Sequence, residues 1–171
     1  MVEVVKLNIG CGLSFEGDVR VDLRKTKAVN LIADAHFLPF KDQSFSQIIC
    51  TEVLEHVNSP IKVLKEIKRV MRKGGLALIT VPNLTELRRI LSIAKNPLRV
   101  RRIETNPKQG WDAIEFSRLT FQVGLRIVKI EWVDWYGRTK MREKFKFLNP
   151  LLKLILPKPL YHTHMKIICQ K

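Results

Sequence analysis

Short apolar segments rich in β-branched residues alternate with glycine turns and helical stretches along this chain. Residues 4–9 form one such segment and run directly into Gly10-Cys11-Gly12. Residues 76–81 form another, which follows a stretch with apolar residues at helical spacing. Buried strands that alternate with amphipathic helices are typical of a parallel α/β sheet. This alternation constrains the fold more tightly than any other feature of the sequence.

The pattern predicts seven strands in a sheet that is mostly parallel, with the last strand antiparallel and helices on both faces. The expected strands cover residues 4–9, 18–23, 29–33, 44–50, 76–81, 125–135 and 162–169. One expected helix begins at Pro60 and ends at a cap formed by Gly74-Gly75. A second covers residues 87–94, and a third covers residues 112–122 and ends at Gly124. We expect a single domain over residues 1–171, with a lid or substrate region at 84–111 and a basic linker at 136–161.

Composition narrows the cellular setting and the class of partner. Residues 1–57 hold 6 basic and 8 acidic residues, whereas residues 58–171 hold 25 basic and 8 acidic ones. A basic half favours an acidic partner such as nucleic acid or an anionic substrate.

The three cysteines are isolated, which argues against a disulfide framework or a zinc ribbon. We see no signal peptide and no run of about 18–20 apolar residues that could span a membrane, so we expect a cytoplasmic protein.

Glycines and acidic residues stand at the ends of the first three expected strands. Ligands of doubly wound sheets bind at the carboxyl ends of the strands. Gly10 and Gly12 would let the backbone approach a ligand closely. Asp22 could accept both ribose hydroxyls, Leu23 could pack on a purine, and Asp34 could accept from an exocyclic amine. Together these residues predict a ligand that contains adenosine.

The spacing of these residues disfavours two common nucleotide sites. A dinucleotide fingerprint has a third glycine and an acid about 20 residues further on. Here Phe15 takes the place of that glycine, and Asp22 comes ten residues after Gly12. A phosphate-binding P-loop needs the pattern G-x-x-x-x-G-K-[ST], which does not occur in the sequence.

Six ordered motifs together resemble the class I S-adenosylmethionine-dependent methyltransferases, and most closely the methyltransferase type 11 family. They are Leu7-Asn8-Ile9-Gly10-Cys11-Gly12, Val21-Asp22-Leu23, Ala33-Asp34-Ala35, Leu38-Pro39-Phe40, Asp42-x-Ser44-Phe45 and Glu52-Val53-Leu54-Glu55-His56. Lys73-Gly74-Gly75 and Val81-Pro82-Asn83 fit the same pattern. The resemblance implies a Rossmann-like methyltransferase sheet, S-adenosylmethionine as the cofactor and S-adenosylhomocysteine as its product.

The resemblance also implies a role for each matching residue. Gly10, Cys11 and Gly12 would line the methionine and ribose end of the cofactor, and Asp22 would hold the ribose. The remaining implied cofactor contacts are Leu23, Asp34, Ala35, Thr51 and Glu52. His56 would border the substrate pocket and is the candidate general base.

The sequence departs from the family pattern at the first turn. Asn8 stands where the family often has an acid, Ser14 replaces a glycine, and the stretch from Gly12 to Val19 is too short for the usual first helix. A non-catalytic binding protein that retains the methyltransferase fold is therefore one alternative.

The basic residues of the C-terminal half suggest how an acceptor would be held. We expect Asn83, Arg99, Arg101 and Arg102 to bind an unidentified acceptor, which the arginines would favour if it were anionic. An RNA-modifying methyltransferase is the alternative that the charge supports, although few aromatic residues are available for stacking.

The segment from Glu52 to His56 superficially matches a zinc motif, but its first position is Glu52, so we expect no metal.

Overall fold

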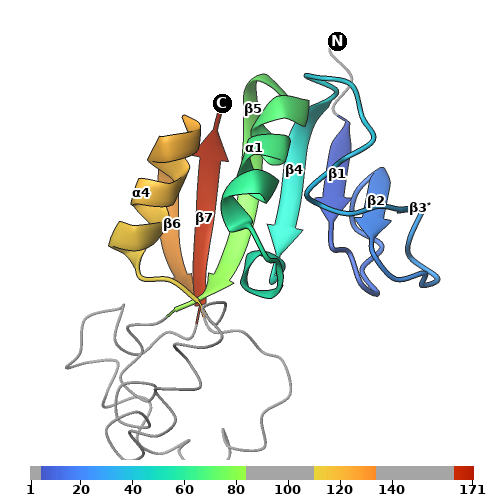
Figure 1. Cartoon of the computed structure of the whole chain (residues 1–171), viewed down its shortest axis with the longest axis horizontal. Helices are drawn as coiled ribbons and strands as arrows, with labels where there is room; N and C mark the ends of the chain where they lie inside the picture. The colour runs from blue at the N-terminus through green and yellow to red at the C-terminus, as the bar shows by residue number, and fades with distance from the viewer. Residues whose placement is uncertain (1–4, 84–109, 134–163) are drawn as a thin grey trace, which may run out of the picture.

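The computed structural model describes residues 5–83, 110–133 and 164–171, and within these ranges the chain forms a seven-stranded sheet (Figure 1). The strands are β1 (Lys6–Ile9), β2 (Val19–Asp22), β3 (Leu31–Ile32), β4 (Phe45–Thr51), β5 (Met71–Pro82), β6 (Arg126–Val133) and β7 (His164–Gln170). The helices are the short 3-10 helix η1 (Leu54–His56) and the α-helices α1 (Pro60–Val70) and α4 (Ala113–Val123). The predicted helix at 87–94, most of the predicted lid and the predicted linker at 136–161 lie outside the described residues.

The strand order is β3-β2-β1-β4-β5-β7-β6. Every pairing from β3 to β5 is parallel, and β7 is antiparallel to both of its neighbours, β5 and β6. The predicted sheet, mostly parallel with an antiparallel last strand, is confirmed. The chain winds outward from β1 to β3 and then returns to β4 on the other side of β1. That reversal places a ligand-binding crevice at the carboxyl ends of β1 and β4.

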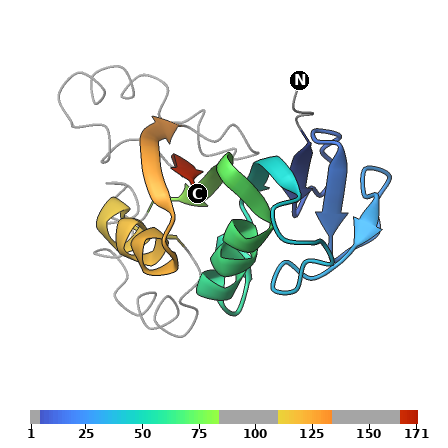
Figure 2. The same ribbon diagram turned by 90° about the horizontal axis from the view of Figure 1, so that it is seen from above.

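Both described α-helices cover the same face of the sheet (Figure 2). Helix α1 buries Val63, Leu64, Ile67 and Val70, and α4 contributes Phe116 and Val123 to the same core. The facing strand residues alternate, as in β7, where Met165, Ile167 and Cys169 are buried. Each buried aliphatic side chain contributes about 1.5–3 kcal/mol, so this layer stabilises the fold and leaves the strand ends available for binding.

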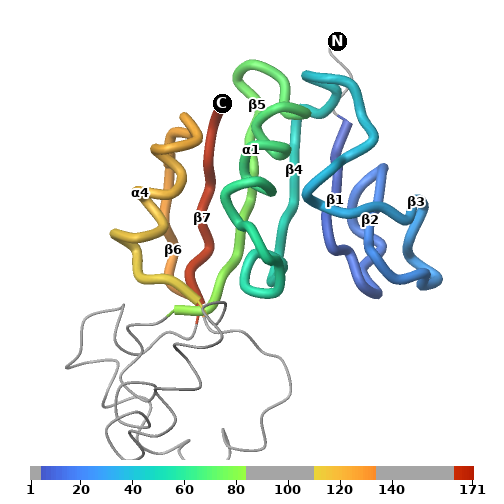
Figure 3. The backbone as a smooth tube through the Cα atoms, viewed as in Figure 1, coloured from blue at the N-terminus to red at the C-terminus, as the bar shows by residue number. Residues whose placement is uncertain are grey.

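The short connections β1–β2 and β2–β3 contain no helix (Figure 3). This agrees with the prediction that the stretch after Gly12 is too short for one. The third strand is also shorter than predicted, because only Leu31 and Ile32 pair with β2. Both side chains are exposed at the edge of the sheet. A strand that is paired on one side and packed on neither face makes few interactions that would stabilise a longer strand.

The predicted glycine cap of α1 is wrong. The helix ends at Val70, and Met71 already pairs with Phe45 as the first residue of β5. Met71 is fully buried, and a Cβ on Gly75 would lie 2.8 Å from its Cγ and 3.0 Å from the Ser46 carbonyl oxygen. The glycine therefore lets β5 approach β4 closely. The prediction failed because a glycine needed for sheet packing has the same signature as a helix cap.

Helix α4 begins and ends close to the predicted positions. Asp112 is the N-cap, and its Oδ1 accepts a hydrogen bond of 2.7 Å from the Glu115 amide. Gly124 follows the helix with φ 72°, a left-handed conformation that glycine adopts without strain. The predicted glycine end is thus confirmed, whereas Asp112, predicted as the first helical residue, is instead the N-cap.

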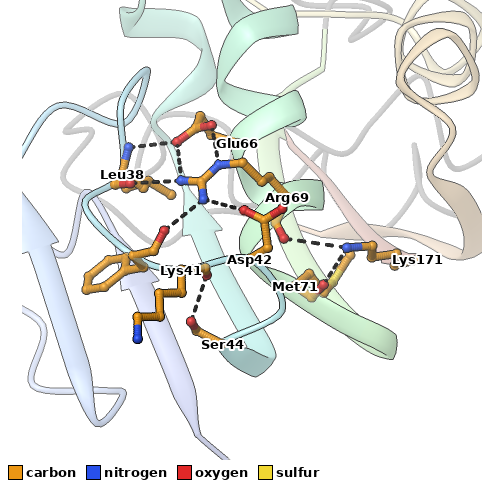
Figure 4. A network of polar contacts seen from close by, with 9 residues as sticks. Leu38, Lys41, Asp42, Ser44, Glu66, Arg69, Met71 and Lys171 are labelled. Atoms are coloured by element: carbon orange, nitrogen blue, oxygen red, sulfur yellow. Dashed lines mark hydrogen bonds and ion pairs between the residues drawn. The ribbon is translucent and has the colours of Figure 1, made fainter.

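The loop between β3 and β4 is fixed to α1 by one arginine (Figure 4). The Arg69 guanidinium donates to the carbonyl oxygens of Leu38 and Phe40 and to the carboxylates of Asp42 and Glu66, at 2.7–2.9 Å. Glu66 in turn accepts from the Leu38 amide at 2.8 Å. The guanidinium holds the pKa of Glu66 below its usual range. This network immobilises the loop that carries Asp34 and Ala35 at its start.

Candidate functional site

The turn after β1 brings backbone to the edge of the crevice. The amides of Gly10 and Cys11 both donate to the Val21 carbonyl oxygen, at 2.8 and 3.1 Å. Gly10 has φ 66°, and a Cβ there would lie 2.3 Å from Cγ2 of Val53. Gly12 has φ 55°, but a Cβ on it would meet nothing within 4 Å. The first glycine is required by the protein itself, whereas the second leaves space that a ligand can enter.

Asp22 closes the other side of this turn at the end of β2. Its Oδ2 accepts a hydrogen bond of 2.9 Å from the Gly12 amide, and its Oδ1 accepts one of 3.0 Å from the Arg24 amide. Each carboxylate oxygen can accept more than one hydrogen bond. The two backbone amides therefore orient the carboxylate and leave it able to accept from a ligand. Leu23 beside it is 67% exposed.

Asp34 is held by a residue that the sequence did not single out. Its Oδ1 accepts from the His36 amide at 2.8 Å and lies 2.6 Å from His36 Nδ1. The backbone hydrogen bond from His36 is the main cause of a lowered pKa of Asp34. The Ser59 amide then donates to His36 Nε2 at 3.3 Å. A chain of contacts thus joins Asp34 to the start of α1.

The residues after β4 form an acidic wall. Glu52 has φ 55°, which is uncommon for a residue with a side chain, and its amide donates to the Thr80 carbonyl oxygen at 3.0 Å. Its Oε2 lies 3.1 Å from Nε2 of His164 at the start of β7. Glu55 is 4% exposed, and burial raises its pKa to about 8. His56 Nε2 lies 3.9 Å from Glu55 Oε1 and the imidazole is largely exposed.

These parts line one cavity of about 340 Å³. Of the residues predicted to bind cofactor or act in catalysis, the cavity brings together Gly10, Gly12, Asp22, Leu23, Asp34, Ala35, Glu52 and His56. Its volume falls within the range of small-molecule sites, about 300–1,000 Å³. The cavity lies at the carboxyl ends of the strands, as the sequence predicts.

Three predicted site residues do not line this cavity. Cys11 is buried in the turn, and its pKa is raised by burial and by the nearby Asp22, which keeps the thiol protonated. Thr51 ends β4 and pairs with Thr80. Asn83 is fully buried and forms a bridge with Trp111. Arg99, Arg101 and Arg102 lie outside the described residues, so their predicted role in acceptor binding stays a prediction.

The structure adds His36, Glu55 and His164 to the site region. No sequence pattern assigns a role to His36 or His164, and Glu55 appears only as part of a motif. A signal existed in the topology, because an antiparallel β7 must begin at the edge where its parallel neighbour β5 ends. His164 therefore had to lie near the end of β4, two strands away.

The described ranges contain no group of three or more His, Cys, Asp or Glu residues arranged to hold a metal ion. In the same ranges, no helix is both long and apolar enough to cross a bilayer.

Comparison with known proteins finds similarity to methyltransferases over part of the chain. Residues 14–79 match the methyltransferase domain family of type 11. An uncharacterised protein of Methanocaldococcus jannaschii is 41% identical over 59 residues, and a demethylmenaquinone methyltransferase of Renibacterium salmoninarum is 34% identical over 79 residues. These matches cover 34% and 46% of this chain and only 26% and 31% of the two relatives, so the chain spans about a quarter to a third of their length.

The fold also matches solved structures over nearly its whole length. The crystal structure of an S-adenosylmethionine-dependent methyltransferase from Archaeoglobus fulgidus superposes with a TM-score of 0.63 at 20% identity, covering 97% of this chain and 85% of the other. The chain therefore shares the fold of that methyltransferase.

Proposed function

We propose that this chain, whose residues 14–79 match the type 11 methyltransferase family, is an enzyme that transfers a methyl group from S-adenosylmethionine to an acceptor. The observation that carries the proposal is the cavity formed by the glycine turn, Asp22 and Asp34. Bound S-adenosylmethionine supplies a methyl group on a positively charged sulfur, which is already strongly electrophilic. The protein then has to hold the cofactor and align the acceptor, and it needs little covalent chemistry of its own.

The residues present fit this cofactor. The open space beside Gly12 is the cradle that a Cβ would fill, so backbone can lie against the ligand there. Asp22 would accept from the ribose hydroxyls with the lone pairs that its two backbone amides leave. The exposed Leu23 side chain would pack on adenine, with Asp34 and Ala35 along its edge. These assignments rest on placement around one cavity and are proposals for each residue.

His56 is the proposed general base for an acceptor that must lose a proton. It lines the cavity, and its largely exposed imidazole can reach a ligand that enters from solvent. The geometry also provides Glu52 on the same wall.

Titration calorimetry with S-adenosylmethionine, S-adenosylhomocysteine and NAD tests the cofactor. We expect micromolar binding of the first two and none of NAD. Asp22→Ala should weaken binding at least about 100-fold, because a carboxylate that accepts two hydroxyl hydrogen bonds contributes about 3 kcal/mol. Asp18→Ala is the matched control, since Asp18 also accepts one backbone hydrogen bond, from Lys6, but lies outside the cavity. Unchanged affinity in Asp22→Ala contradicts the ribose assignment, and no binding by the wild type favours the non-catalytic alternative.

The charge of residues 58–171 supports an RNA acceptor as the second candidate. Backbone phosphates would then be neutralised by lysines and arginines, with release of counterions. We expect such binding to fall by orders of magnitude between 50 and 200 mM salt, as measured by filter binding. Salt-independent or undetectable binding of RNA removes this candidate and leaves cofactor binding untouched.

A further inference from the structure

The two oxygens of the Asp34 carboxylate differ in how the protein holds them. The Oδ1 atom accepts a hydrogen bond from the His36 amide and lies 2.6 Å from His36 Nδ1. The Oδ2 atom makes no hydrogen bond to any residue in the described ranges, and the Asp34 side chain is 45% exposed. Asp34 and His36 both line the cavity. One oxygen is therefore anchored by the protein, and the other remains available to a ligand.

The hydrogen-bond partners of His36 fix the position of its ring proton. The Ser59 amide donates to Nε2 at 3.3 Å. A backbone amide can only donate, so Nε2 accepts, and the proton of the neutral imidazole lies on Nδ1. Nδ1 therefore donates to Asp34 Oδ1. The imidazole is 15% exposed, so little water competes for either contact.

This arrangement makes Asp34 an acceptor of hydrogen bonds only. The backbone hydrogen bond from His36 is the main cause of its lowered pKa, and the contact with the imidazole also lowers it. The carboxylate is thus ionised at neutral pH. The 6-amino group of adenine is a donor, whereas the 6-oxo group of hypoxanthine is an acceptor. A fixed Oδ2 therefore favours adenine and repels an oxo group at the same place.

We propose that His36 is a positioning residue that sets the nucleobase specificity of the cofactor site. The inference rests on the methyltransferase function proposed above, in which Asp34 contacts the base. His36 acts through Asp34, because it holds Oδ1 with both its amide and its imidazole. Ser59, at the start of α1, holds the imidazole in turn. Without the imidazole, the carboxylate can turn away from an oxo group, and adenine loses its advantage.

Two ligands that differ only in the base test this role. S-adenosylhomocysteine carries adenine, and S-inosylhomocysteine carries hypoxanthine. Titration calorimetry gives the ratio of their dissociation constants. We expect the wild type to bind the adenine compound at least about 30-fold more tightly, because its amino group donates to a carboxylate. His36→Ala should lower this ratio about fivefold, since only the backbone hydrogen bond then holds Oδ1.

Two conservative variants separate the contacts of the imidazole. The amide nitrogen of an asparagine can take the place of Nδ1, so His36→Asn should keep the ratio within about twofold of wild type. The amide oxygen of a glutamine can take the place of Nε2 and accept from Ser59, so His36→Gln should lower the ratio as His36→Ala does. Asn30→Ala is the matched control. Asn30 Oδ1 accepts from the Arg20 amide at 2.9 Å in the neighbouring loop, outside the cavity, so the ratio should not change.

The ring proton of His36 gives a readout that needs no ligand. In protein with ¹⁵N-labelled histidine, long-range proton–nitrogen correlation spectra should show His36 protonated at Nδ1 and not at Nε2 at neutral pH. His36→Asn identifies the signals of this ring by their absence. The largely exposed His56 ring should show, in the same spectra, the Nε2-protonated form that predominates in free histidine.

A ratio that His36→Ala leaves unchanged overturns the inference, even if both ligands bind more weakly, because His36 then only supports the loop. A ratio that falls equally in His36→Asn and His36→Gln overturns it too, and this contrast decides if His36→Ala does not fold. A His36 ring protonated at Nε2, or a wild-type ratio near one, has the same consequence. Failure of the wild type to bind S-adenosylhomocysteine is a different result: it counts against the proposed function, and the inference falls with it.

Discussion

Two groups of charged side chains lie at opposite ends of the first α-helix and differ in how they are satisfied. At the C-terminal end of α1, Arg69 makes hydrogen bonds to two carboxylates and two backbone carbonyls, and Glu66 accepts from both Arg69 and Leu38. Before its N-terminal end, Glu52 and Glu55 hold three buried oxygens without a partner in the described residues.

The difference in hydrogen bonding indicates that the Arg69 group contributes to stability, whereas the Glu52–Glu55 pair does not. A fully connected network rigidifies the structure around it, whereas a buried carboxyl group without partners destabilises the folded state. The hydrogen bonds of Arg69 stabilise the folded state and fix the loop between β3 and β4. The buried Glu52–Glu55 pair destabilises the folded state beside the cavity. We expect substitutions in the two groups to shift stability in opposite directions.

The largest effect should come from Arg69→Met. The substitution keeps much of the side-chain volume but removes every hydrogen bond of the guanidinium, and it leaves the Glu66 carboxylate half-buried without its partner. We expect a loss of about 3 kcal/mol in the free energy of unfolding, measured by urea denaturation. Lys65→Met, on the exposed face of the same helix, should change it by less than about 0.5 kcal/mol. Equal effects of the two variants would remove the basis of the comparison.

The pH dependence of stability should expose Glu55. Its pKa is raised from 4.5 to about 8 in the folded state, so between these values the folded chain holds a proton that the unfolded chain releases. Stability is therefore fully present below pH 4.5 and is lost as pH rises through the window toward 8. At the full slope of about 1.4 kcal/mol per pH unit, wild type should lose about 2 kcal/mol from pH 6 to 7.5 relative to Glu55→Gln. Parallel stability curves for the two proteins would show that Glu55 is already ionised.

A matched pair of glutamate substitutions gives the smallest and most direct contrast. Glu66→Gln loses the charge that Arg69 and the Leu38 amide share, and it should cost about 1 kcal/mol at pH 7.5. Glu55→Gln removes a buried ionisable group that lacks partners, so at the same pH it should be neutral or stabilising. The two unfolding curves, recorded under identical conditions, should therefore lie on opposite sides of the wild-type curve. Destabilisation by both variants would mean that Glu55 has a stabilising contact.

The sequence predicts the parts of this molecule that depend on local order. The strands, their parallel winding and the glycine turn follow from short apolar runs and from the residues that end them. The end of α4 follows from Gly124. Gly10, Gly12, Asp22 and Asp34 were placed in one cavity because parallel strands end at the same edge.

The sequence does not predict the features that depend on contacts across the sheet. Gly75 looked like a helix cap because its close approach to Met71 and Ser46 is visible only once β4 and β5 are paired. His164 is 112 residues from Glu52 and meets it through the antiparallel entry of β7. The burial of Glu55 cannot be predicted from the sequence, because a short helical turn shows the same sequence pattern whether its glutamate is exposed or buried.

The position of β7 also constrains the order in which the chain can assemble. This strand comes last among the described elements, yet it lies between β5 and β6 and is the one strand of the described sheet that pairs with β6. On a ribosome, β6 and α4 emerge before the strand that joins them to the rest of the sheet. The N-terminal strands β1 to β5 can pair as they are made, while the last third of the domain waits for its final residues. Folding of this protein is then expected to finish only after synthesis has passed Gln170.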